Sequence, residues 1–320
     1  MMEVEAKSRE RTLFVPGIVG PTASGKTKLA TLLADRYSQI EVISADSRQI
    51  YVGMDIGTAK PSKEIRERIP HHLIDIHAPD HRYSAGQFAR NASQAIESII
   101  SRGNIPLVVG GTGFYVHALF KGLSAPAADS KIYAELEKRL ATEGYESLFN
   151  ELLRVDPEAA RLFPKESRVK TLRALTCWHQ TGVCYSTFYD RDRYSSNLSP
   201  SYCLMLPERK QLYHRINKRV IEMFDEGLVD ETKALIGAGY SANAPGLRTV
   251  GYKEVIEMFG GKIDSSEVIP AVQQSTRRYA KRQYTWFRNK LDSEVVTVET
   301  VSEGVEWFTH WIERRREPRE

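Results

Sequence analysis

The sequence has no run of about 18 or more apolar residues, so it predicts no transmembrane helix. Residues 1–12 are charged and have no apolar core, which argues against a secretory signal. There are three cysteines, Cys177, Cys184 and Cys203, and no C-x-x-C pair. This pattern excludes a disulfide framework and a zinc site, and it fits a reducing compartment. We therefore expect a cytoplasmic protein with no membrane partner.

Charge of one sign is not in large excess, because the net charge of the 320 residues is only +4. The composition, 41% hydrophobic and 27% charged, is that of a globular protein with room for one large domain carrying an insertion, or for two domains. The basic residues gather late in the chain. A weak overall charge with a strong local one predicts a polyanionic partner held on one face.

One stretch matches the phosphate-binding pattern G-x-x-x-x-G-K-[ST], and it consists of Gly20, Pro21, Thr22, Ala23, Ser24, Gly25, Lys26 and Thr27. The glycines let the backbone turn its N–H groups inward, Lys26 supplies a point charge, and the Thr27 hydroxyl can ligate Mg²⁺. A helix over residues 28–37 adds its positive N-terminal end. The alternative is a glycine-rich turn without a ligand. The motif predicts a bound diphosphate or triphosphate and does not specify a nucleotide.

Strand and helix patterns alternate after this loop. Strands are predicted at residues 13–19, 41–46, 69–76, 106–110 and 202–206, with a helix at 87–102. The alternation predicts an α/β fold with a parallel sheet, whose ligands lie beyond the carboxyl ends of the strands. Thr22, Asp46 and Thr112 should then surround one crevice. Pro16 cannot donate to a central ladder, so we expect the first strand to begin late or with a bulge.

The middle of the chain has only helical periodicity, at residues 132–140, 145–155 and 168–179, with a polar loop at 190–200. Asp129 and Asp156 are predicted to begin helices. We therefore divide the chain into a P-loop core over residues 12–121, an inserted all-helical domain over 122–200, and a second part of the core over 201–320. Adjacent His71 and His72 should point to opposite faces of a strand, which favours structural roles over a metal pair.

The late part of the chain is basic. A long helix is predicted over residues 208–237, on which Arg215 and Arg219 share a face. A second helix over 276–291 carries no acidic residue, and its positions 277, 281, 284 and 288 form one face of Arg, Lys, Tyr and Arg. A solvated helix face, the alternative, would normally carry acidic residues too. Basic side chains mixed with rings favour contact with RNA.

A phosphate-loop ATPase or GTPase needs a strand that ends in a metal-binding Asp, and a GTPase needs an N-K-x-D-like guanine reader. The strand at 106–109 ends in Gly-Gly-Thr instead, and the guanine reader is missing. Asp46 stands at the tip of the second strand, opposite the phosphate loop.

At this point the sequence resembles the tRNA dimethylallyltransferases, or tRNA isopentenyltransferases. The motifs that carry the resemblance cover nearly the whole chain: GPTASGKT, DSRQIY, DIGTAKP, GGT, VGYK and KRQYTWFR. The resemblance implies transfer of a dimethylallyl group from dimethylallyl diphosphate to N6 of adenosine 37, 3′ of the anticodon, in tRNAs reading codons that start with U. It also implies Mg²⁺ and a tRNA anticodon stem-loop as partner. No Cys/His cluster follows residue 291, so the chain resembles the bacterial form, and we expect a monomer.

The resemblance assigns roles to single residues. Asp46 is the expected base, Thr112 a hydrogen-bond donor near the bridging oxygen, and Arg219 and Arg215 stabilise the diphosphate with Lys26 and Mg²⁺ on Thr27. The expected tRNA contacts are Asp46, Ser47, Arg48, Gln49, Thr112, Val169, Lys170, Thr171, Leu172, Arg173, Arg248, Thr249, Val250, Gly251, Tyr252, Lys253, Lys281, Arg282, Gln283, Tyr284, Thr285, Trp286, Phe287 and Arg288.

Two other functions share some of these features. A P-loop small-molecule kinase would share the loop and the helical lid but leaves the basic late helix unexplained. A non-catalytic RNA-binding module with a structural P-loop leaves Asp46 and Thr112 without a task.

Overall fold

The computed structural model describes residues 12–123, 125–126, 128–163, 167–188, 197–291 and 294–316. The N-terminal stretch up to residue 11 and most of the polar loop predicted at 190–200 lie outside these residues. The chain divides into two compact units. The first comprises Met1–Phe120 and Asn197–Glu320, and the second comprises Lys121–Ser196.

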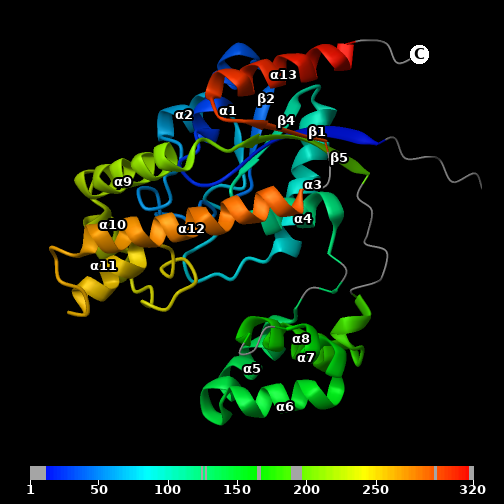
Figure 1. Cartoon of the computed structure of the whole chain (residues 1–320), viewed down its shortest axis with the longest axis vertical. Helices are drawn as coiled ribbons and strands as arrows, with labels where there is room; N and C mark the ends of the chain where they lie inside the picture. The colour runs from blue at the N-terminus through cyan, green and yellow to red at the C-terminus, as the bar shows by residue number, and fades with distance from the viewer. Residues whose placement is uncertain are drawn as a thin grey trace, which may run out of the picture. The chain divides into compact units, whose positions relative to one another are not determined.

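The first unit is built on a six-stranded sheet (Figure 1). Every pair of neighbouring strands is parallel, so the predicted parallel α/β sheet is confirmed. The strands, in spatial order, are β3 (His71–His72), β2 (Ile40–Ser44), β4 (Ile105–Gly110), β1 (Leu13–Val19), β5 (Leu198–Met205) and β6 (Glu294–Val298). The central strands are continuous apolar runs because helices cover both faces of the sheet.

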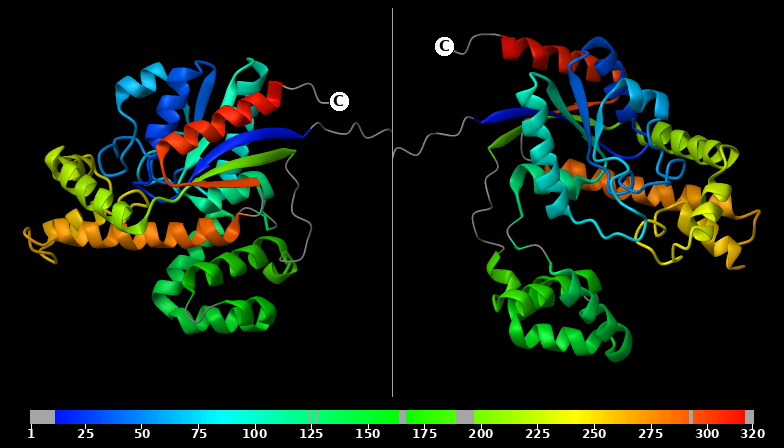
Figure 2. Two further views of the ribbon diagram at one scale, coloured as in Figure 1. Left: turned by 45° about the horizontal axis from the view of Figure 1, so that its top comes forward. Right: turned by 180° about the vertical axis from the view of Figure 1, so that it is seen from behind.

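Two helices, α1 (Lys26–Arg36) and α13 (Val301–Arg316), lie side by side over one face of the sheet (Figure 2). They share one buried cluster with the strands, in which the Phe308 ring lies 5.5 Å from that of Tyr37. The other face is covered by α3 (Ala85–Ser101) and α4 (Gly113–Lys121). On that side the Phe120 ring is nearly perpendicular to the Tyr202 ring on β5, with 5.7 Å between the ring centres.

The register of the central strands places three loops at one edge of the sheet. Ser44 pairs with Val109, and Val19 pairs with Gly110, so β2, β4 and β1 end together. Ala45, Gly111 and Gly20 therefore begin neighbouring loops at the carboxyl edge, where ligands of parallel sheets bind. At this edge the sequence predicts a crevice around Thr22, Asp46 and Thr112.

The predicted first strand differs from the structure at Pro16. We expected a late start or a bulge, but β1 pairs with β5 from Leu13 without interruption, including Pro16 opposite Ser201. Pairing with β4 begins only at Gly17. Pro16 therefore lies where the strand has one neighbour, which leaves room for a missing N–H.

Two other predicted elements are shorter than the sequence suggested. The strand predicted at 69–76 is reduced to His71–His72, because Leu73 and Asp75 adopt left-handed conformations with φ of 63° and 53°. The long helix predicted at 208–237 is two helices, α9 (Arg209–Asp225) and α10 (Leu228–Gly237). Gly227, with φ of 101°, breaks it.

A second core holds the late helices together. It joins residues 50–54 to α10, to α11 (Tyr252–Phe259) and to the start of α12 (Val268–Lys290). A short helix, α2 (Lys63–Arg68), precedes β3. The α12 helix also bonds to α9, since Arg277 and Gln273 donate to the side chain and carbonyl of Asn217 at 2.6 and 3.1 Å.

The described part of the second unit is helical, with α5 (Ser130–Glu143), α6 (Tyr145–Val155), α7 (Pro157–Leu162), α8 (Arg168–Thr181) and a 3-10 turn at Tyr185–Phe188. Asp129 and Asp156 begin helices as predicted, each accepting backbone N–H bonds of the first turn. Asp156 is 1% exposed and also accepts the Ser186 N–H at 2.8 Å, so one carboxylate ties α7 to the 3-10 turn.

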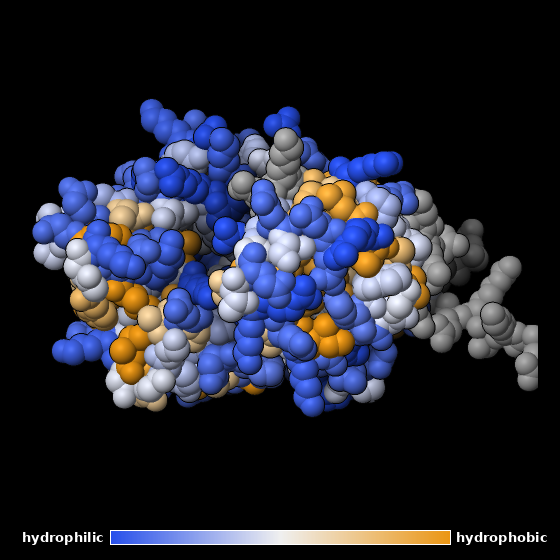
Figure 3. Space-filling model, turned by 90° about the horizontal axis from the view of Figure 1, so that it is seen from below, coloured by the Kyte–Doolittle hydropathy of each residue, from blue (hydrophilic) through white to orange (hydrophobic). Residues whose placement is uncertain are grey.

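Hydrophilic residues dominate the face of the molecule drawn in Figure 3, where hydrophobic residues form scattered patches. The large exposed apolar side chains come from unrelated elements, among them Phe114, Leu162 and Val169. Among the described helices, none is long and apolar enough to cross a membrane.

Candidate active site

The phosphate loop joins the end of β1 to the first turn of α1. Gly20 has φ of 147°, and a Cβ there would collide with the Met205 carbonyl, so only glycine fits. Gly25 (φ 104°) and Ala23 (φ 61°) are also left-handed. The Ser24 hydroxyl is buried and has no hydrogen-bond partner among the described residues. A buried hydroxyl in that state is suited to a phosphate oxygen.

The loops after β2 and β4 are bonded to each other at the same edge. Thr112 donates its N–H to the Ala45 carbonyl at 3.1 Å, and its Oγ1 accepts the Ser47 N–H at 3.0 Å. Asp46 Oδ1 accepts the Arg48 N–H at 2.8 Å, which fixes the turn after β2. Thr112 and Asp46 are therefore held on one connected pair of loops.

A cavity of about 330 Å³ opens at these loops. Its lining includes many of the predicted site residues, namely Thr22, Ala23, Gly25, Lys26, Thr27, Asp46, Arg48, Gln49, Arg219, Arg248, Thr249, Val250, Arg282 and Gln283. The structure thus brings Asp46 and Arg219 to the phosphate loop from distant parts of the sequence. Arg215, four residues before Arg219 on α9, is exposed and is not among the lining residues.

Three charged groups influence one another in this cavity. Burial lowers the pKa of Lys26 to about 7, the Asp46 carboxylate opposes that change, and the Arg219 guanidinium adds to it. Burial also lowers the pKa of Arg219. The Lys26 ammonium donates to the Pro21 carbonyl at 2.6 Å. Two crowded cations beside backbone N–H groups form a site for a multiply charged anion.

We expect the affinity for inorganic diphosphate to fall as the pH rises above 7. Free Lys26 loses its proton in that range because its pKa is about 7, whereas the bound anion favours the protonated form. The loss approaches about tenfold per pH unit for one linked proton. Titration calorimetry from pH 6 upward measures it. Lys26→Met cannot titrate at this position, so the change of its affinity with pH reports the ionisation of the diphosphate itself. If the affinity changed with pH in the same way in both proteins, Lys26 would not be the titrating group that binds the diphosphate.

The inner face of α12 lines the cavity, and sequence reasoning missed part of it. Gln283 was among the predicted residues, but three further residues that line the cavity were not: Val272, Thr276 and Tyr279. Burial and the nearby Asp46 carboxylate raise the pKa of Tyr279 to about 12. Positions 272, 276, 279 and 283 are three or four residues apart and therefore share one helix face. This spacing, applied from Gln283 toward the N-terminus of the helix, would have predicted the other three residues.

Gln283 connects α12 to both glycine loops. Its Oε1 accepts the Thr22 N–H at 2.9 Å, and its Nε2 donates to the Gly111 carbonyl at 2.8 Å. The side chain is 6% exposed. Gln283 was expected to contact tRNA, but this geometry makes it a brace between the phosphate loop and the loop after β4.

Several other expected tRNA contacts are buried side chains. Tyr252 is 0% and Phe287 1% exposed, and the Thr249 hydroxyl donates to the Gly246 carbonyl at 2.5 Å. Trp286 packs against Gly113, where a Cβ would collide with its ring. The members of the two segments that reach the surface are Arg248, Lys253, Lys281, Arg282, Thr285 and Arg288, with Tyr284 half-buried.

The expected tRNA segment at residues 169–173 forms the first turns of α8 in the second unit. Val169 and Lys170 are exposed, and the Lys170 ammonium lies 5.5 Å from the centre of the Phe163 ring. Thr171 and Leu172 are buried. Arg173 is half-buried and donates to the Pro126 carbonyl. Two of the five side chains are therefore open to a partner, and the others hold the unit together.

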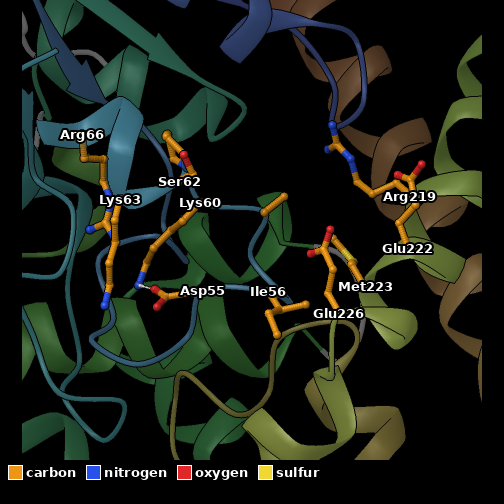
Figure 4. A pocket seen from close by; sticks show the side chains of 12 residues that line it. Asp55, Ile56, Lys60, Ser62, Lys63, Arg66, Arg219, Glu222, Met223 and Glu226 are labelled. Carbon is orange, nitrogen blue, oxygen red and sulfur yellow. Dashed lines mark hydrogen bonds and ion pairs between the residues drawn. The ribbon is translucent and has the colours of Figure 1, made fainter. Parts of the chain in front are cut away.

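A second cavity, of about 380 Å³, adjoins the first, and both are lined by Ala59, Arg219 and Met223. Figure 4 shows Arg219 and Met223 of α9, and Glu226 directly after this helix, on one side of it, across from Lys60 and Arg66. The DIGTAK loop, residues 55–60, thus borders both cavities. This motif contributed to the family resemblance, but the sequence analysis predicted no role for it.

Comparison with known proteins matches residues 49–290 to the IPP transferase family. The chain is 44% identical over 300 residues to tRNA dimethylallyltransferase 2 of Geotalea uraniireducens, covering 92% of this chain and 95% of that one. A solved tRNA delta(2)-isopentenylpyrophosphate transferase of Staphylococcus epidermidis is 33% identical, with a TM-score of 0.68 over 95% of this chain and 99% of that one. A eukaryotic dimethylallyltransferase acting on tRNA is 26% identical, with a TM-score of 0.77 over 95% and 77% of the two chains.

Proposed function

Since this chain belongs to the IPP transferase family, we propose that it transfers a dimethylallyl group from dimethylallyl diphosphate to N6 of adenosine 37 in tRNAs that read codons starting with U. The observation that carries the proposal is the shared cavity of the phosphate loop, Arg219 and Asp46. It offers cations for a leaving diphosphate and, facing them, a carboxylate that can accept a proton.

The reaction divides between these groups. The adenine N6 attacks the allylic carbon, the C–O bond to the diphosphate breaks, and its electron pair leaves with the diphosphate. Lys26, Arg219 and the N–H groups of the phosphate loop stabilise the charge that develops there. Asp46 accepts the proton released from N6. The resemblance gives Thr112 a hydrogen bond to the bridging oxygen. In the structure its hydroxyl accepts the Ser47 N–H at 3.0 Å and donates to Ser47 Oγ at 3.3 Å, and Thr112 is not among the residues that line the cavity, so this role requires the hydroxyl to turn toward the donor.

The residues present fit Mg²⁺. Thr27 is exposed at the first turn of α1 and lines the cavity, and its hydroxyl is a hard oxygen donor of the kind that Mg²⁺ takes. Bound there, Mg²⁺ would neutralise charge on the diphosphate. We also propose that the active form is a monomer.

The exposed basic side chains of α12 support tRNA as the partner. Lys281 and Arg288 are seven residues apart and so lie on one face, and Arg282 lies over the Tyr279 ring at 5.7 Å. The adenosine has to leave its stack to reach the cavity, as in other enzymes that act on a base. A cationic face beside the cavity would hold the backbone while the base enters.

Changing both Lys281 and Arg288 to Ala should weaken tRNA binding and reduce the slope of log K against log salt by about one unit per lost phosphate contact. The KM for the allylic donor should stay unchanged. Filter binding over a salt series measures the slope. Lys218→Ala, which removes an exposed lysine of α9, is the matched control. A collapse of donor affinity with normal tRNA binding would contradict the assignment of this face.

Labelling separates the proposed function from a kinase and from a non-catalytic RNA-binding module. The protein is incubated with unmodified tRNA and either dimethylallyl diphosphate labelled in the allyl group or ATP labelled in its terminal phosphate. We expect the allyl label alone to reach RNA. Transfer of the phosphate label to RNA would favour a kinase that acts on RNA. The absence of both labels from RNA would favour a small-molecule kinase or a binding module, which hydrolysis or transfer of the ATP label to a small molecule would then distinguish.

A further inference from the structure

The DIGTAK loop has an unusual backbone where the two cavities meet. Ala59 adopts a left-handed conformation with φ of 50°, although it is not glycine. Such a conformation is unfavourable for a residue that carries a Cβ, and it persists only where the surroundings impose it. Gly57, Thr58 and Ala59 line the phosphate-loop cavity, and Ala59 also lines the second one. The shape of this loop therefore sets part of the wall of the site.

One carboxylate holds the first half of the loop. Glu231 on α10 accepts the backbone N–H groups of Asp55 at 2.9 Å, Ile56 at 3.0 Å and Gly57 at 3.3 Å. It also accepts the Tyr252 hydroxyl at 2.6 Å. Three consecutive N–H groups that converge on one anion form a concave backbone segment, and bonds to an ionised acceptor are the strong ones.

Tyr252 completes the same contact. Its hydroxyl accepts the Gly57 N–H at 3.1 Å, and a Cβ at Gly57 would collide with its ring. The ring is 0% exposed, and burial, helped by Glu231, raises the Tyr252 pKa far above its ordinary value. The hydroxyl therefore stays protonated and donates to Glu231.

The second half of the loop is held from other directions. Gln49 donates to the carbonyls of Thr58 and Ala59 at 3.4 and 3.2 Å. Lys60, with a side chain 1% exposed, donates to the Tyr51 carbonyl at 2.6 Å and pairs with Asp55 at 2.7 Å. Of these groups Glu231 makes the most backbone bonds, and it lies outside both cavities.

We propose that Glu231 is a positioning residue for the donor site, whose carboxylate keeps residues 55–60 folded against the cavity opposite Arg219. This rests on the proposed function, because the donor is taken to occupy that cavity. Without the carboxylate the strained turn at Ala59 relaxes and the wall at residues 57–59 moves. The diphosphate end of the donor then loses its contact with the cavity wall at residues 57–59. The exposed basic face of α12 is unaffected.

The test compares Glu231→Gln with wild type and with Asp230→Asn, an exposed carboxylate one residue earlier on the same helix. Gln keeps the size but places an NH₂ group where backbone N–H groups need an acceptor. We expect inorganic diphosphate affinity to fall and donor KM to rise by roughly tenfold or more. Amide exchange at residues 55–57 should accelerate, tRNA affinity should stay unchanged, and Asp230→Asn should behave as wild type.

Unchanged diphosphate affinity and donor KM in Glu231→Gln would overturn the inference, even if the melting temperature fell, because the residue would then act on stability alone. Should Glu231→Gln fail to fold, Tyr252→Phe, which removes one bond to the carboxylate, carries the same comparison with a smaller expected change. A wild-type protein that binds diphosphate but transfers no allyl group would contradict the proposed function. The diphosphate affinities of the two variants would still decide the role of Glu231.

Discussion

Asp46→Asn should lower the single-turnover rate of dimethylallyl transfer by roughly 10²–10⁴-fold. The substitution keeps an oxygen that can accept the Arg48 N–H, the bond that Asp46 Oδ1 makes at 2.8 Å, so the turn after β2 survives. It removes the charge and the basicity. Affinity for tRNA and the melting temperature should stay near wild type. Rapid-quench measurement with saturating donor and tRNA reports the rate.

The other role open to Asp46 is to fix its turn and nothing more. In that case Asp46→Asn transfers at the wild-type rate, and Asp46→Ala loses about 1 kcal/mol of stability without a specific effect on chemistry. Comparing the two substitutions therefore distinguishes a catalytic base from a residue that only stabilises the turn after β2. A wild-type rate in Asp46→Asn would assign proton acceptance to solvent or to another group.

Lys26→Ala should reduce the rate of transfer by on the order of a hundredfold or more, because it removes a half-buried charge from the diphosphate site. Binding of tRNA should be nearly unchanged, since the expected tRNA contacts on α12 are other residues. At a fixed saturating concentration of tRNA, the kcat and the kcat/KM for dimethylallyl diphosphate should both fall. Equal activity of mutant and wild type would remove the phosphate loop from the mechanism.

A stability measurement on Lys26→Met supplies the control. Burial lowers the pKa of Lys26 in the folded state to about 7, from the ordinary lysine pKa of 10.5 in the unfolded chain. The unfolded state thus binds more protons between those values, and wild-type stability should rise with pH across that window. Lys26→Met should lack this rise and be at least as stable at pH 7. A large loss of stability would mean that Lys26 is structural.

The core of the site was predictable because its signals are local. The phosphate loop is one short motif, and parallel strands that end together bring Asp46 and Thr112 beside it. What failed also has a local cause. The left-handed backbone of Gly227 ends the first of two helices where the sequence predicted one long helix. A glycine within a helical pattern can either be tolerated or end the helix, and the sequence does not distinguish the two cases.

The roles of single motif residues were harder to predict. Gln283 and Tyr252 stand in motifs that predict tRNA contact, yet both are buried and are bonded to loops that line the phosphate-loop cavity. Which side of α12 faces the cavity depends on contacts with Thr22 and Gly111, far away in the sequence. Glu231 lies in no motif and acts through backbone N–H groups, which have no sequence signature.

The most direct test of the account is nucleoside analysis of an unmodified tRNA after reaction with the wild-type protein and dimethylallyl diphosphate. The account predicts that one adenosine, at position 37, gains a dimethylallyl group in place of one N6 hydrogen, and that one diphosphate is released for each modified nucleoside. A modified nucleoside at another position, an unchanged tRNA, or release of diphosphate without modification would contradict it.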